Sequence, residues 1–204
     1  MKKSLIQLLV VISLIFSDGI LSADINKGKE KSVTCVACHG ENGISVSPIW
    51  PNLAGQHLQY LKSQMLEFRK GQNGKRNNPV MYGITLTLSD DDIESLAMYY
   101  SSLDKSIGLT KDEYLVKGQS IYRGGNLKYK IQACIACHGP NGQGNLPAGI
   151  PVLSGQHALY IEQQLKNFRS GARSNDPNKM MRNVVHRMTD DEIRSVAEYI
   201  QGLY

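Results

Sequence analysis

One six-residue pattern occurs twice in this chain and uses all of its cysteines. CVACHG spans residues 35–40 and CIACHG spans residues 134–139, and the chain of 204 residues has 4 cysteines. In each copy the two cysteines stand three positions apart, so that on a helix they share one face, and a histidine follows directly. Any fold of this chain must therefore position the same group of side chains twice.

The sequence around these motifs is duplicated as well. Residues 53–71, LAGQHLQYLKSQMLEFRKG, align without a gap with residues 153–171, LSGQHALYIEQQLKNFRSG, at an offset of 100. Residues 88–103 align with residues 188–203 at the same offset. A tandem duplication predicts two small domains of similar structure. We place them at residues 24–104 and 105–204, and the second carries an insertion before its cysteines.

Hydrophobic periodicity predicts an all-α fold. Ser89 with Asp92, and Thr189 with Glu192, form the capping-box pattern that starts a helix, and apolar residues follow at helical spacing. A second helix is expected near residues 56–70 of the first copy, and a third is expected to carry the cysteines at its end. Three short helices bury little apolar surface, so we expect a large bound group in each domain.

The first 23 residues have the pattern of a secretory signal peptide. Lys2 and Lys3 precede an apolar run from residue 5 to residue 16, and small residues follow at Ser22 and Ala23. The run is short for a membrane span, although an uncleaved N-terminal anchor is the alternative. The pattern therefore predicts a periplasmic protein cleaved near Ala23.

CxxCH is the attachment pattern of a c-type haem, in which the cysteines form thioethers and the histidine binds the iron. A disulfide within each pair would constrain little of the chain and would leave the histidines without a role. A zinc site would need both pairs around one ion, and a thiol oxidoreductase would need a βαβ pattern. We therefore predict two covalently attached haem c groups, on Cys35, Cys38, Cys134 and Cys137, with His39 and His138 as iron ligands.

The repeat also indicates the second axial ligand of each iron. Of 7 methionines, Met81 and Met181 alone align between the copies, whereas the neighbouring Met180 aligns with Val80. A thioether ligand closes the iron to substrates and favours electron transfer.

The other histidines are expected to have different roles. His57 and His157 align near the start of a predicted helix, which favours capping or packing over iron ligation. His186 aligns with Leu86 and is expected at the surface, with ligation as the alternative if Met181 does not bind.

These motifs resemble the cytochrome c4 family of exported two-haem cytochromes. The resemblance covers nearly all of residues 24–204 and rests on CVACHG, CIACHG, LAGQH, LSGQH, RGGN and the C-terminal MMRNVVHRMTDDEIRSVAEYIQGL. It implies two cytochrome c domains related by an approximate twofold axis, with haem edges that meet between them. By similarity, one haem is held by Cys35, Cys38, His39 and Met81, and the other by Cys134, Cys137, His138 and Met181. The segment before Met81 is shorter than in some relatives. This difference affects the expected geometry of that loop and not the identity of the ligand.

The resemblance further implies a carrier that passes electrons one at a time between respiratory partners and is not an enzyme. The expected donor is a quinol-oxidising complex or a dehydrogenase, and the expected acceptor is a terminal oxidase. The alternatives are a dedicated cytochrome subunit of a dehydrogenase, such as a flavoprotein's partner, and a dihaem peroxidase, which needs an open axial site. Peripheral association with a membrane is left open.

Charge argues against a nucleic-acid partner. Residues 24–204 hold 21 Lys and Arg against 17 Asp and Glu, an excess that the propionates of two haems would offset. The excess lies in residues 105–204, with 13 basic and 8 acidic side chains, whereas residues 24–104 hold 8 and 9. This asymmetry could steer an acidic redox partner to the second half, or could simply keep the protein soluble.

Overall fold

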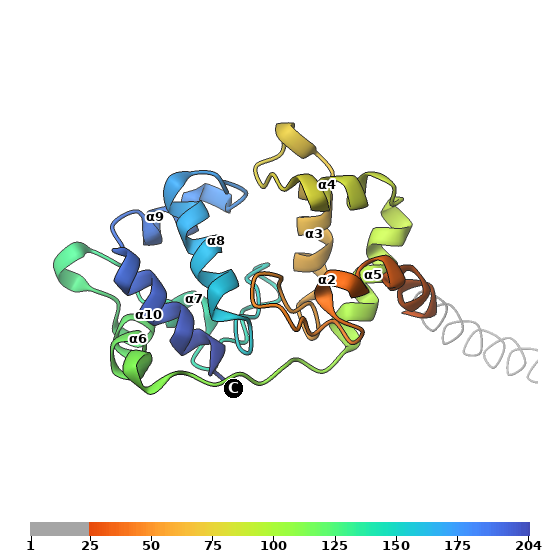
Figure 1. Cartoon of the computed structure of the whole chain (residues 1–204). Helices are drawn as coiled ribbons and strands as arrows, with labels where there is room; N and C mark the ends of the chain where they lie inside the picture. Colours follow the sequence, from red (N-terminus) through yellow and green to blue (C-terminus); the bar gives the residue numbers. More distant parts are fainter. Residues whose placement is uncertain (1–24) are drawn as a thin grey trace, which may run out of the picture.

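The computed structural model describes residues 25–204, which form two groups of helices joined by an extended segment at residues 103–111 (Figure 1). In the described part of the chain, β-pairing is limited to isolated bridges, and no strand forms. The all-α fold predicted from periodicity is confirmed. The predicted signal peptide lies outside the described residues.

The first group begins with a helix over residues 25–31, which crosses the last helix of the group. At this crossing Gly28 lies so close to its neighbour that an added Cβ would come 2.1 Å from the backbone oxygen of Ser95. The other elements of this group are η1 (Ser32–Thr34), α2 (Val36–His39), α3 (Leu58–Phe68), η2 (Gly71–Asn73), α4 (Pro79–Leu86) and α5 (Asp90–Ser102).

The second group repeats this arrangement. Its first helix, α6 (Asp112–Gly124), packs against its last helix, α10 (Asp190–Gln201), and a Cβ on Gly118 would come 2.3 Å from the Ser195 backbone oxygen. A glycine therefore permits the same close helix crossing in both copies. Between these helices lie η3 (Leu127–Tyr129), α7 (Ile135–His138), α8 (Ala158–Ser170), η4 (Pro177–Lys179) and α9 (Met180–Val185).

Both predicted capping boxes are present, at Ser89 with Asp92 and at Thr189 with Glu192. The helix expected near residues 56–70 is α3, and its counterpart is α8. The cysteines, in contrast, do not end a long helix, because α2 and α7 are separate helices of 4 residues each. In the second group a loop separates α6 from α7, and Gly125 turns the chain there with a φ of 67°. This loop lies where the insertion was expected.

Each group has its own hydrophobic core. The first core contains Leu61, Leu96 and Tyr100, and Cys35 packs against it. The second core is larger and is built mainly from α6, α8 and α10, and Cys134 and Met181 pack against its edge. The two motifs thus lie beside two separate cores, although the precise boundary between the domains stays a prediction.

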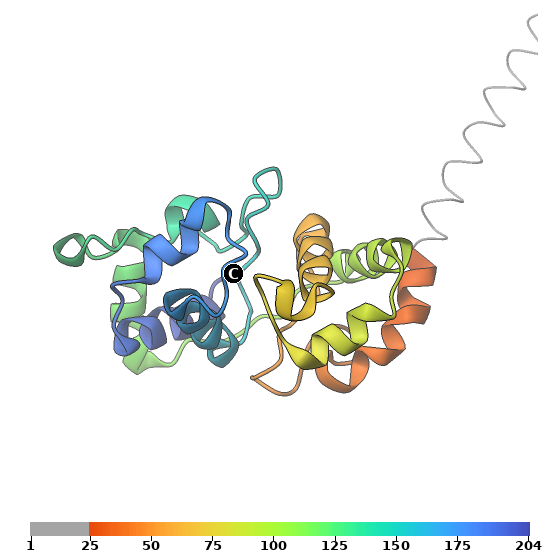
Figure 2. The ribbon, with the colours of Figure 1, turned by 90° about the horizontal axis from the view of Figure 1, so that it is seen from above.

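The two groups meet through the loops that precede α3 and α8, as the second view shows (Figure 2). The Gln56 amide donates to the Val152 carbonyl and accepts from the Val152 N–H, at 2.9 Å each. Gln156 forms the same two bonds, also 2.9 Å each, with Asn52. Because each partner is offset by 100 from its counterpart, the contacts are related by an approximate twofold axis.

Among residues 25–204, every helix is too short or too polar to cross a membrane.

Candidate haem sites

The first site is a pocket with the side chains of CVACH on one side and α4 on the other. It is lined by Thr34, Cys35, Cys38, His39, Trp50, Val80, Met81 and Ile84. The structure therefore brings together all four residues predicted for the first haem. Cys35 immediately precedes α2 and Cys38 lies within it, so that both thiols are carried by one helical turn. Both thiols are free.

The histidines of both motifs are buried and oriented by a backbone carbonyl. The Nδ1 of His39 lies 2.8 Å from the Pro51 oxygen, and the Nδ1 of His138 lies 3.1 Å from the Pro151 oxygen. Because a carbonyl only accepts, Nδ1 carries the proton and Nε2 keeps its lone pair for a metal. Burial lowers the pKa of His39 and of His138, which favours the neutral imidazole that binds iron.

The methionines differ in their exposure. Met81 lies in α4, and its backbone N–H donates to the side chain of Asn78, which caps this helix. In α9, Met181 packs against the second core, as Cys134 does, whereas the neighbouring Met180 is 45% exposed. The interior position in the second site is therefore held by Met181 rather than by Met180.

The donors fit a haem better than the alternatives considered from the sequence. The first site offers two free thiols, one imidazole with an available Nε2 and a thioether, which is a donor set for a c-type haem. The second motif carries the same residue types, with Cys134 and Met181 packed against the second core and Cys137 exposed. A zinc site is not supported, because no group of three or more His, Cys, Asp or Glu side chains in residues 25–204 is arranged so that it could hold a metal ion. Burial also raises the pKa of the Cys134 thiol to about 12, which disfavours a reactive thiolate.

A family model described as Cytochrome c matches residues 25–104 and again residues 115–204. Cytochrome c4 of Azotobacter vinelandii is 38% identical over 100% of both chains. The chain belongs to the cytochrome c4 family.

Solved structures include a similar cytochrome c4. The crystal structure of reduced recombinant cytochrome c4 from Pseudomonas stutzeri is 40% identical, has a TM-score of 0.84, and covers 87% of this chain and 97% of its own. A thiosulfate dehydrogenase electron acceptor of Thiomonas intermedia is 37% identical over 83% of this chain and 78% of its own. Like other members of the cytochrome c4 family, the chain is a dihaem electron-transfer protein with two covalently bound haem c groups.

The remaining histidines of the chain make other contacts. His57 and His157 occupy the N-cap positions of α3 and α8 but make no capping bond. Instead the His57 Nδ1 lies 3.0 Å from the Ile150 oxygen, and the His157 Nε2 lies 2.9 Å from the Ser45 oxygen, both across the domain interface. His186 is exposed and its Nδ1 lies 2.8 Å from the Asn183 oxygen.

Sequence reasoning did not identify the residues of the domain interface. Gln56 and Gln156 bind the opposite domain, and so do the buried side chains of Arg76 and Arg173. The repeated GQH motif was a signal for the glutamines, because a shared polar triplet with no role inside its own domain suggests an interface. The two arginines are not aligned at the offset of 100, so the repeat did not connect them.

Proposed function

We propose that this member of the cytochrome c4 family is a periplasmic carrier that passes electrons one at a time between respiratory partners and performs no reaction on a substrate of its own. The observation that supports this most directly is the pocket in which Cys35, Cys38, His39 and Met81 meet. With both His39 and Met81 bound to it, a haem iron in this pocket would have no open position for a substrate.

In this proposal the residues of the two motifs hold the haems. Cys35 and Cys38 anchor the first haem, and Cys134 and Cys137 anchor the second. His39 and Met81 would bind the iron of the first haem, and His138 and Met181 would bind that of the second. When bound, a haem c supplies the one-electron exchange between ferric and ferrous iron.

The protein contributes rigid positioning. The bonds from His39 to the Pro51 carbonyl and from His138 to the Pro151 carbonyl fix the orientation of each imidazole. The side chain of Asn78 accepts a hydrogen bond from the Met81 N–H, and this cap fixes the start of the helix that carries the methionine. Ligands held in this way reorganise little when the charge of the iron changes, which suits a carrier.

Two candidate functions differ in their physiological redox partners. Our first candidate is a carrier that accepts electrons from a quinol-oxidising complex or a dehydrogenase and delivers them to a terminal oxidase. The second is a dedicated electron acceptor of one dehydrogenase, a role that the similarity to thiosulfate dehydrogenase electron acceptors favours. A dihaem peroxidase is the weakest candidate, since both sites offer a methionine to close the iron.

The proposal is tested by a spectroscopic redox titration of the purified holoprotein together with its intact mass. The mass should show two haems on a chain that begins near residue 24, and both haems should be low-spin and reversibly reduced. A high-spin haem that binds cyanide readily in the untreated protein would contradict the carrier function. Reduction by thiosulfate with a purified thiosulfate dehydrogenase, much faster than by a quinol-oxidising complex, would favour the second candidate.

A further inference from the structure

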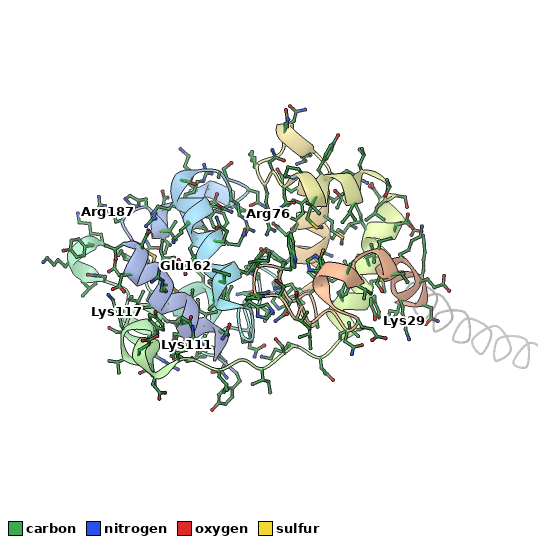
Figure 3. The ribbon with its side chains drawn as sticks, in the orientation of Figure 1. Lys29, Arg76, Lys111, Lys117, Glu162 and Arg187 are labelled. Carbon is green, nitrogen blue, oxygen red and sulfur yellow. The ribbon has the colours of Figure 1, made fainter. Side chains whose placement is uncertain are left out.

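Two arginines are buried at the boundary between the domains. Arg76 is 7% exposed and Arg173 is 6% exposed, and their backbones form an isolated antiparallel bridge. Figure 3 shows Arg76 between the two domains. Each guanidinium stacks on a ring of its own domain, at 4.6 Å from the Phe68 centroid for Arg76 and 4.4 Å from the Phe168 centroid for Arg173.

The hydrogen bonds of these arginines cross between the domains. Arg76 donates to the hydroxyl of Tyr160 and, at 2.7 Å, to Gln64. Arg173 donates to the hydroxyl of Tyr60 at 2.8 Å and also to Gln64 at 3.1 Å. Each guanidinium therefore contacts polar groups of both domains, and the two share a partner.

No carboxylate compensates this pair. Among the ion pairs of residues 25–204, none involves Arg76 or Arg173. Burying a charge without a counter-charge is costly, and two like charges that share a partner add repulsion. Burial lowers the pKa of Arg173, and the charge of Arg76 lowers it further. An anion beside the pair would offset both of these costs.

The tyrosines supply further hydrogen-bond donors at the same place. Each hydroxyl accepts a bond from the arginine of the opposite domain, and in the described residues neither Tyr60 nor Tyr160 uses its own proton in a bond. Burial would raise the pKa of Tyr60, but the charges of Arg173 and Arg76 outweigh it and lower that pKa. The group as a whole is therefore rich in donors and positive charge.

The cluster lies on helices that pack against the two helices of the predicted methionine ligands. Tyr60 and Gln64 lie on α3, which contacts the helix of Met81, and Tyr160 and its neighbour Gln164 lie on α8, which contacts the helix of Met181. The carboxylates of a haem lie on the edge opposite the vinyl groups that the cysteines hold. Two haems anchored at their cysteines thus bring carboxylates, which are the anions that the arginine pair lacks.

We propose that Arg76 and Arg173 act together as the buried counter-charge for the haem carboxylates at the domain interface, and that each arginine raises the reduction potential of both haems. A nearby positive charge favours the ferrous state, because that state has the lower positive charge. The tyrosines are positioning residues that connect each guanidinium to the opposite domain. The proposal rests on the carrier function proposed above and adds an electrostatic coupling between its two centres.

The test is a spectroscopic redox titration of the holoprotein with Arg76→Gln and Arg173→Gln. Each variant should lower the potentials of both haems, with about a tenfold fall in the equilibrium constant for reduction, which corresponds to about 59 mV for one electron. Arg69→Gln and Arg169→Gln are the matched controls, because they remove the same charge from arginines bound to Asp90 and Asp190 outside the interface. The controls should shift the potentials much less.

Potentials in the Arg76 and Arg173 variants equal to those of the controls would overturn the proposal. If glutamine at these positions prevents folding, Arg76→Lys and Tyr160→Phe provide the same test. Arg76→Lys should keep the reduction potentials close to those of the unsubstituted protein, because the positive charge remains. Tyr160→Phe should lower the reduction potentials without any change of net charge. Unchanged potentials in the Tyr160 variant would likewise overturn it. If only the arginine proposal is wrong, the unsubstituted protein still has two low-spin haems. If the proposed carrier function is wrong, the unsubstituted protein itself lacks two low-spin haems.

Discussion

The side-chain amide of Gln56 binds both backbone polar groups of Val152 in the opposite domain, at 2.9 Å each. Both residues are buried or nearly so, so water does not replace these bonds easily. With the symmetric pair formed by Gln156, four buried hydrogen bonds of this kind join the two domains.

Replacement of either glutamine should therefore weaken the interface. Gln56→Ala leaves the Val152 N–H and carbonyl without partners, at a cost of about 1–3 kcal/mol per unsatisfied group in the free energy of unfolding. Urea unfolding measures the loss, and amide exchange at Val152 should become faster. Gln163→Ala on the exposed face of α8 is the control and should be close to neutral. Equal stability of the Gln56 and Gln163 variants would contradict a structural role for the interface bond.

The methionines should behave as separable ligands. Met81→Ala and Met181→Ala are each expected to convert one haem from low-spin to high-spin, because the thioether that closes the iron is removed. Absorption and electron paramagnetic resonance spectra of the oxidised holoprotein measure this change. Met180→Ala should leave both haems low-spin, since that side chain is 45% exposed. A high-spin haem in the Met180 variant instead would show that the ligand is Met180 rather than Met181.

The helix crossing in the second domain should tolerate no side chain at Gly118. An added Cβ would lie 2.3 Å from the Ser195 oxygen, so Gly118→Ala must push α6 and α10 apart, at a cost of about 1–3 kcal/mol. Gly124→Ala on the same helix meets no atom within 4 Å and is expected to be neutral or slightly stabilising. Thermal and denaturant unfolding of the two variants measure the difference. Similar stabilities would mean that the helices separate at little cost.

Acid should remove part of the stability of the first domain. Hydrogen bonds from the backbone and hydroxyl of Ser89, supported by Lys27 and Lys31, hold the pKa of the Asp92 carboxyl well below its usual range. A depressed pKa stabilises the folded state above the unfolded value of about 3.9, and this contribution is lost as the pH falls further. Asp92→Asn should thus be less stable than the unsubstituted protein at pH 7, and the difference should narrow toward pH 3.

Denaturant midpoints at the two pH values test this prediction. Asp104→Asn is the control, because Asp104 is exposed and forms no ion pair within residues 25–204. A difference between Asp92→Asn and the unsubstituted protein that is as large at pH 3 as at pH 7 would show that the shape of the cap matters rather than its charge.

Much of the fold and the candidate sites could be predicted from the sequence because the information is local. Two cysteines and a histidine within five residues share one helical turn wherever the chain places it, and the capping boxes of α5 and α10 are complete within four residues. The duplication added what a single copy lacks, since it separated Met81 and Met181 from the other methionines. The short helices α4 and α9 escaped prediction because they are too brief to show a hydrophobic period.

The sequence by itself thus determined two cytochrome c domains, each with a haem c, and predicted the residues that hold these haems. Only the tertiary structure decided how the domains face each other, and therefore that Arg76 meets Tyr160 and that His57 and His157 bind the opposite domain instead of capping their helices. The physical reason is that these contacts join residues 84 to 112 positions apart on surfaces with no shared periodicity. Their complementarity exists only once both domains are folded and packed together.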